Sequence, residues 1–141
     1  MPRIQIEMAK STMARIGRKT MIADIELLRL AAKAAGIKIN EKWQAGREEI
    51  GRGDLGLWTT TSTNWNPLED DGDALRLAVK LNLIIGPFAT YVSVAETYDK
   101  PKLGAQGREF VCWHHETKGD QLAATRRAIV RAAAEIGRAM P

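Results

Sequence analysis

The sequence predicts an α+β domain in which a small antiparallel sheet packs against about three helices. Three features support this fold class. Three stretches have apolar residues at helical spacing: residues 20–35, a stretch in the middle of the chain, and residues 120–138. Two β-branched and aromatic stretches in the second half are joined by a loop that contains glycine and proline. The length of 141 residues fits one domain.

The first helix is expected over residues 20–35, where apolar residues recur at helical spacing and Gly36 follows as a C-terminal stop. Residues 37–39 alternate in the manner of a short strand. Residues 40–54 are polar and charged and contain several glycines, which is typical of a loop. Residues 57–63 are rich in threonine and tryptophan and predict an extended strand that ends in a turn.

The second helix is expected to open at Asn66-Pro67. Asparagine is a favoured N-cap, proline is tolerated at the first helical position, and Glu69 lies three residues after the cap. Acidic residues in the first turns suit the positive end of the helix dipole. We expect the apolar face of this helix to contain Leu68, Leu75, Ala78, Val79 and Asn82.

Gly86-Pro87 predicts a break after the second helix. Residues 89–98 then form a strand, residues 99–107 a hairpin-like loop, and residues 109–116 the returning strand. Alternation along the returning strand places Phe110, Cys112 and His114 on one face and Val111, Trp113 and His115 on the other. The last helix is expected over residues 120–138, with an apolar stripe of Leu122, Ile129, Ala133 and Ile136.

Composition limits the cellular setting and the partners. Cys112 is the only cysteine, so no intramolecular disulfide can form, which suits a reducing compartment. The chain has neither an apolar run of about 20 residues nor the apolar segment of a secretory signal, so we expect a cytoplasmic protein without membrane contact. The net charge of +4 favours a polyanionic partner, although it is equally compatible with an ordinary solvated surface. Residues 1–19 are basic and are expected to form an arm outside the domain of residues 20–141.

Neither a catalytic set nor a metal site is complete. Cysteine and histidine at 112, 114 and 115 are able to bind zinc or to form a nucleophile–base pair, but no second cysteine completes a structural zinc site. The acidic run Glu69, Asp70, Asp71 and Asp73 has the chemistry to hold Mg²⁺, yet the helix dipole alone explains it. The glycines of residues 46–56 do not fit a phosphate-binding loop. We therefore expect no metal, no cofactor and no enzymatic activity.

A nucleotide pocket is the most specific chemistry that the residues suggest. Trp58 and Trp65 flank the polar run of residues 59–64, and the last helix contributes Arg126, Arg127 and Arg131. Aromatic faces stack on bases, hydroxyls and amides recognise base edges, and arginine binds phosphate through paired hydrogen bonds. The alternative is that the tryptophans belong to the core and the arginines to the solvated surface.

The same residues carry a family resemblance. Residues 61–65, Thr-Ser-Thr-Asn-Trp, precede an apolar helix and resemble the Ser-Thr-Asp-Trp segment of small bacteriophage proteins of the NinX-like kind. Residues 122–130 resemble the C-terminal helix of that family, which has a similar Ala-Ala-x-Arg core. Asn64 stands where the family usually has aspartate. The two matches cover about a third of the chain.

The resemblance implies a phage or prophage accessory protein in the host cytoplasm. Proteins of that class include several that sequester the nucleotide second messengers of bacterial immunity. The hypothesis is a homo-oligomeric sponge for a cyclic or other signalling nucleotide, which inhibits anti-phage defence. Trp65 and Trp58 would stack on a base, Asn64 and Thr63 would recognise its edge or a ribose hydroxyl, and Arg126 and Arg127 would neutralise phosphate.

Two alternatives belong to other classes. A nucleic-acid-binding accessory factor would use the basic arm and the last helix, and its binding would fall steeply with salt. A small nucleotide hydrolase would need a general base, for which His114 and His115 are the only histidines.

Overall fold

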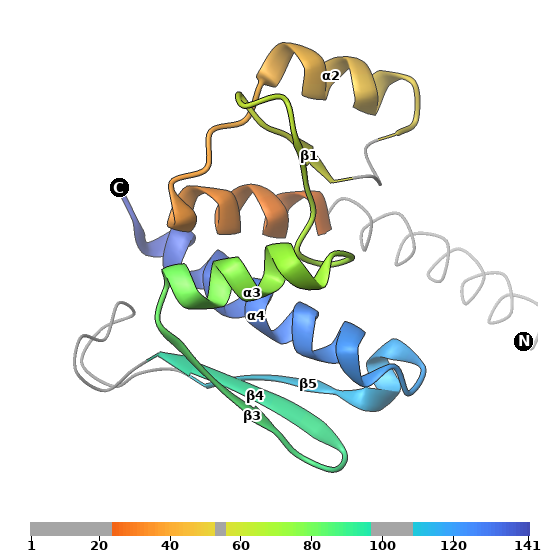
Figure 1. Ribbon diagram of the computed structural model, residues 1–141, viewed down its shortest axis with the longest axis vertical. Helices are drawn as coiled ribbons and strands as arrows, with labels where there is room; N and C mark the ends of the chain where they lie inside the picture. Colours follow the sequence, from red (N-terminus) through yellow and green to blue (C-terminus); the bar gives the residue numbers. More distant parts are fainter. Residues whose placement is uncertain (1–23, 53–55, 97–108) are drawn as a thin grey trace, which may run out of the picture.

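The described part of the chain is an α+β fold, which confirms the predicted class. The computed structural model describes residues 24–52, 56–96 and 109–141. A three-stranded antiparallel sheet in the order β3-β4-β5 lies under helix α4, and further helices lie on the far side of α4 (Figure 1). A separate pair of short antiparallel strands, β1 and β2, lies between α2 and α3 in the chain. The helices therefore cover one face of the three-stranded sheet.

The elements follow one another in a simple order. A helix over residues 24–35 opens the described chain. It is followed by α2 (Glu41–Glu49), β1 (Leu57–Trp58), β2 (Asn64–Trp65), α3 (Asp71–Lys80), β3 (Leu83–Pro87), β4 (Tyr91–Glu96), β5 (Glu109–Trp113), the 3-10 helix η2 (His114–Thr117) and α4 (Gln121–Ala139).

Helix α4 forms the centre of the core because most of its residues are small. Its buried positions are mainly alanine, together with Ile129, Val130 and Ile136. The apolar stripe predicted for this helix is confirmed except at Leu122, which is 63% exposed. Val92 and Val94 of β4 are fully buried beneath the helix. On its other side α4 meets α3 and the helix over 24–35, so one helix joins the layers.

Helix α2 corrects the prediction of a loop over residues 40–54. The Asn40 side chain accepts a hydrogen bond from the Trp43 amide and caps the helix. Gln44 is fully buried, donates to the Gly56 carbonyl and accepts from the Trp58 amide. The helix is therefore held by a cap and by a buried amide instead of an apolar stripe, which is why periodicity did not reveal it.

Helix α3 begins later than predicted and buries a different face. Asp70 is its N-cap and accepts from the Asp73 amide, whereas Asn66 closes the turn before it. Leu75, Ala78, Val79 and Asn82 do lie along one face, but Leu75 and Val79 are 61% and 67% exposed, so this apolar face is not the buried one. The buried face consists of Ala74, Leu77, Ala78 and Leu81.

The strands are shorter than predicted, and two of them, β2 and β3, were missed. Residues 83–87 form the edge strand β3 where a break was expected, and an edge strand tolerates Pro87 because its outer side needs no ladder hydrogen bond. The extended stretch of residues 57–63 is only β1 followed by a turn, and residues 37–39 contribute a single bridge from Ile39 to Thr59. The strand predicted over residues 109–116 ends at Trp113.

Several predictions lie outside the described residues: the basic arm of residues 1–19, the start of the first helix before residue 24, and the hairpin loop of residues 99–107. Among the residues that the structure does describe, no helix combines the length and apolar character that crossing a bilayer requires.

The crossing of α4 with the helix over 24–35 gives a first prediction. A Cβ built on Gly137 would lie 2.0 Å from the Leu30 carbonyl oxygen, so Gly137→Ala must separate the two helices. We expect a loss of about 1–3 kcal/mol in the free energy of unfolding, measured by urea denaturation. Gly46→Ala is the matched control, because its Cβ meets open space within α2 and should stabilise by up to about 1 kcal/mol. Equal stability of Gly137→Ala and the wild type would contradict this packing.

Candidate functional site

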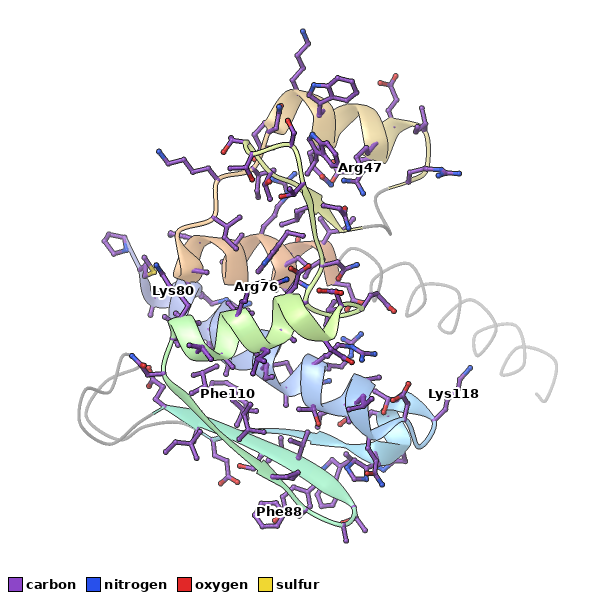
Figure 2. The ribbon with its side chains drawn as sticks, viewed as in Figure 1. Arg47, Arg76, Lys80, Phe88, Phe110 and Lys118 are labelled. Carbon is purple, nitrogen blue, oxygen red and sulfur yellow. The ribbon has the colours of Figure 1, made fainter. Side chains whose placement is uncertain are left out.

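A cavity of about 610 Å³ opens between three segments of the fold. One wall is residues 36–38, which follow the helix over 24–35, the second is the turn between β1 and β2, and the third is α3. Figure 2 shows Arg76 on the side of α3 that faces the helix over 24–35. The lining residues are Gly36, Ile37, Lys38, Thr59, Thr60, Thr61, Thr63, Asn64, Trp65, Asp73 and Arg76.

Three threonine hydroxyls meet in the turn that forms one wall. Thr59 Oγ1 lies 2.9 Å from Thr61 Oγ1 and 2.8 Å from Thr63 Oγ1, and the last two lie 3.2 Å apart. The turn is tightened by Ser62, whose φ is 58°. Since each hydroxyl both donates and accepts, this cluster can offer hydrogen bonds of either kind to a polar ligand.

Asn64 and Trp58 are directly paired across β1 and β2, and Arg47 of α2 joins them. The guanidinium carbon of Arg47 lies 5.5 Å from the Trp58 ring centroid, and its Nη2 donates to Asn64 Oδ1 at 2.7 Å. The other terminal nitrogen of Arg47 is buried and makes no hydrogen bond within the described structure. The face of Trp58 is therefore occupied by a cation, while Asn64 is held in place where it lines the cavity.

Two cations and one carboxylate give the cavity its charge. Lys38 and Arg76 lie on its rim, and both are exposed. Asp73 accepts from Arg76 at 2.8 Å and from the Asn66 amide at 3.0 Å, so the carboxylate is engaged within the fold. The hydrogen bond to Asp73 raises the pKa of Arg76. The lining carries one excess positive charge.

Trp65, Asn64 and Thr63 are thus brought together in one cavity, as the sequence suggested. Trp65 is only 7% exposed, so most of its indole belongs to the core and its remaining surface faces the cavity. Trp58 does not line this cavity.

Arg126 and Arg127 also lie away from the cavity, in ion pairs that hold α4 to other elements. Arg126 donates to the Leu68 carbonyl at 2.7 Å and to Asp71 at 2.6 Å. Arg127 donates two hydrogen bonds to Asp24, at 2.9 and 3.1 Å, and this pairing raises the pKa of Arg127. Their positive charges are therefore used inside the fold.

Arg131 is tied in a similar way to the end of β5. It donates to the Val111 carbonyl and to Glu116, each at 3.0 Å. The hydrogen bond from Arg131, reinforced by one from the Trp113 amide, lowers the pKa of Glu116 from 4.5 to about 2.

The cysteine and histidines do not form a site. Cys112 faces the core, and burial raises the pKa of its thiol, which disfavours the reactive thiolate. His115 instead stacks with Trp113 on the outside. Among the described residues, no group of three or more histidine, cysteine, aspartate or glutamate side chains has a geometry that could hold a metal ion.

Sequence reasoning missed Lys38, Asp73 and Arg76. Aspartate and arginine at positions 70, 73 and 76 recur every three residues, which is the spacing of one helix face and of the observed ion pairs. That spacing could have placed Arg76 beside the acidic run. Nothing in the local sequence connects Lys38 with Arg76, because only the fold brings these two residues to the same cavity.

Comparisons of the chain with known protein families, with curated proteins and with solved structures find no match. The site therefore rests on its own geometry.

The Arg127–Asp24 pair yields a stability prediction. Arg127→Met keeps the aliphatic stem but leaves Asp24 without its two hydrogen bonds, so we expect a loss of about 1–2 kcal/mol in the free energy of unfolding. A double-mutant cycle with Asp24→Asn isolates the interaction. Independent, additive effects of the two substitutions would show that the pair does not hold α4.

Glu116 yields a pH prediction. Because its pKa is lowered in the folded protein, its contribution to stability is complete above its ordinary value of 4.5 and is lost as the pH falls toward about 2. The stability difference between the wild type and Glu116→Gln, followed by thermal unfolding from pH 6 to pH 2, should shrink over that interval. A difference that stays constant would contradict the ion pair with Arg131.

Proposed function

We propose that the chain binds a small nucleotide in the cavity between residues 36–38, the β1–β2 turn and α3. The observation that carries this proposal is the convergence of a tryptophan, a cluster of threonine hydroxyls and two exposed cations around one cavity. Its volume of about 610 Å³ falls in the range of small-molecule sites.

Each part of a nucleotide has a chemically suitable partner in the lining. The base would lie against Trp65 and Ile37, and Thr63 and Asn64 would recognise its edge or a ribose hydroxyl. Lys38 and Arg76 would bind phosphate in place of Arg126 and Arg127, which lie outside the cavity. Arg76 also pairs with Asp73, but its side chain is 72% exposed, whereas those of Arg126 and Arg127 are 13% and 25% exposed. A single excess charge favours a ligand with few phosphate charges, such as a cyclic nucleotide.

We propose further that the bound nucleotide is held without conversion. The only carboxylate of the lining is engaged by Arg76 and the Asn66 amide, and the lining contains neither histidine nor cysteine. The resemblance to NinX-like phage proteins supports a more specific role, in which a homo-oligomer sequesters a nucleotide immune signal in the host cytoplasm. Nucleic-acid binding through α4 is less favoured because Arg126, Arg127 and Arg131 all have acidic partners.

A capture-and-release experiment tests this function. The purified protein is mixed with linear nucleotides, cyclic mononucleotides, cyclic dinucleotides and ADP-ribose derivatives, free ligand is removed, and the protein is heat-denatured. We expect one ligand class to be captured and to return chemically intact. Arg76→Ala should weaken its capture about tenfold or more, because a charged hydrogen bond to phosphate is lost.

Arg138→Ala is the matched control. Arg138 is also exposed and also pairs with an acidic residue three positions away, but it lies at the end of α4, outside the cavity lining. An equal loss of capture in Arg76→Ala and Arg138→Ala would show that capture depends on the net charge of the protein and not on the cavity. Release of an altered ligand would make the protein an enzyme, and failure to capture any member of the panel would remove the proposal.

A further inference from the structure

The face of the three-stranded sheet opposite α4 is unusually apolar. An antiparallel sheet that is covered on one side normally alternates apolar residues inside with polar residues outside. Here the outward positions of the strands hold mostly apolar side chains, and Ile84 and Trp113 are 43% and 46% exposed. No described element covers this face, and Figure 2 shows Phe88 on it while Phe110 points toward α4.

A row of aromatic rings crosses one end of this face. The ring centroids of Phe88 and Tyr91 lie 4.9 Å apart, those of Tyr91 and Trp113 5.0 Å, and those of Trp113 and His115 6.4 Å. Beyond this row the outward positions hold smaller side chains, with Val111 opposite Ser93, and Glu109 opposite Ala95 at the far end. Ser93 is itself only 9% exposed.

The charges on the face restrict its occupant. The outward positions of β3, β4 and β5 include no lysine or arginine, so the face lacks the cations that a nucleic acid backbone requires. Its carboxylate, Glu109, is hydrogen-bonded by the Ser93 hydroxyl. A second copy of this chain matches such a face, because it meets apolar surface with apolar surface, and the one carboxylate that each copy adds is already hydrogen-bonded within its own chain.

We infer that two copies of the chain pair through this sheet face about a two-fold axis. The axis seats the aromatic row of each copy on the smaller side chains of Ala95 and Val111 of the other, since a two-fold interface must be complementary to itself. The two sheets would then pack about 10 Å apart, as in a β-sandwich. The inference gives the proposed homo-oligomer its interface and uses no residue of the cavity.

The face is small for an interface. Half-exposed Phe88 and Trp113, with Ile84 and the side chains between them, can bury on the order of 500 Å² per copy, below the roughly 800 Å² of a stable interface. We therefore expect a weak, reversible dimer whose population depends on protein concentration.

Sedimentation velocity from about 1 μM to about 500 μM tests the interface on the full chain. We expect the wild type to pass from monomer to dimer, and Trp113→Ser and Phe88→Ser to raise the dissociation constant at least roughly tenfold. Trp43→Ser is the matched control, because Trp43 is 65% exposed on α2, away from the sheet. Circular dichroism confirms that each variant is folded, and Ile84→Lys serves as a second probe of the face should either aromatic variant unfold.

A wild type that stays monomeric at every concentration overturns the inference, as does a dimer that Trp43→Ser weakens and the sheet variants leave intact. A monomer that binds single-stranded oligonucleotides through Trp113 would assign the face to nucleic acid and also overturn it. Nucleotide capture, measured separately on the same variants, distinguishes a failure of this interface from a failure of the proposed function.

Discussion

The fold depends on how closely helix α4 approaches its neighbours on both sides. Alanine and glycine dominate its buried positions, so its backbone can contact the Leu30 carbonyl at Gly137 and the sheet below at the same time. Larger side chains at these positions would push the layers apart, and close-packed interiors tolerate such expansion poorly. The cavity depends on this packing indirectly, because α3, which forms one wall, and the helix over 24–35, which leads into residues 36–38, are placed by their contacts with α4.

Arginine reinforces this arrangement. Three arginines of α4 reach three different partners, namely the turn before α3, the start of the helix over 24–35 and the end of β5. Each pairs a charged donor with an acceptor at the edge of the core, where hydrogen bonds to charged groups are stronger than neutral ones. Part of the positive charge of the chain therefore stabilises the fold through ion pairs. The cations of the cavity lining are Lys38 and Arg76.

Much of the fold could be predicted from the sequence because periodicity follows directly from burial. The last helix and the strands at Tyr91 and Glu109 have clear patterns, and the structure contains all three. Helix α2 has no apolar stripe, since a buried glutamine holds it, and β3 was hidden by a glycine and a proline that an edge strand accepts. The apolar spacing of Leu75 and Val79 did not identify the buried face of α3, because spacing alone does not reveal which helix face a neighbouring element covers.

The candidate site was predicted only where its residues are adjacent in sequence. Thr63, Asn64 and Trp65 lie together on one turn and line the cavity together. Lys38 and Arg76 come from separate segments that the fold brings to the same rim. Arg126 and Arg127 look the same in sequence whether they bind phosphate or an aspartate of the fold. Only the structure distinguishes these two uses of arginine.

Amide NMR spectra recorded during titration with the captured nucleotide test the central claim most directly, since they locate the ligand residue by residue. We expect the largest shifts on Lys38, on residues 59–65 and on Arg76, with small changes along α4. Shifts centred on Arg126 and Arg127, or on the outer face of the sheet, would show that the ligand binds outside the cavity.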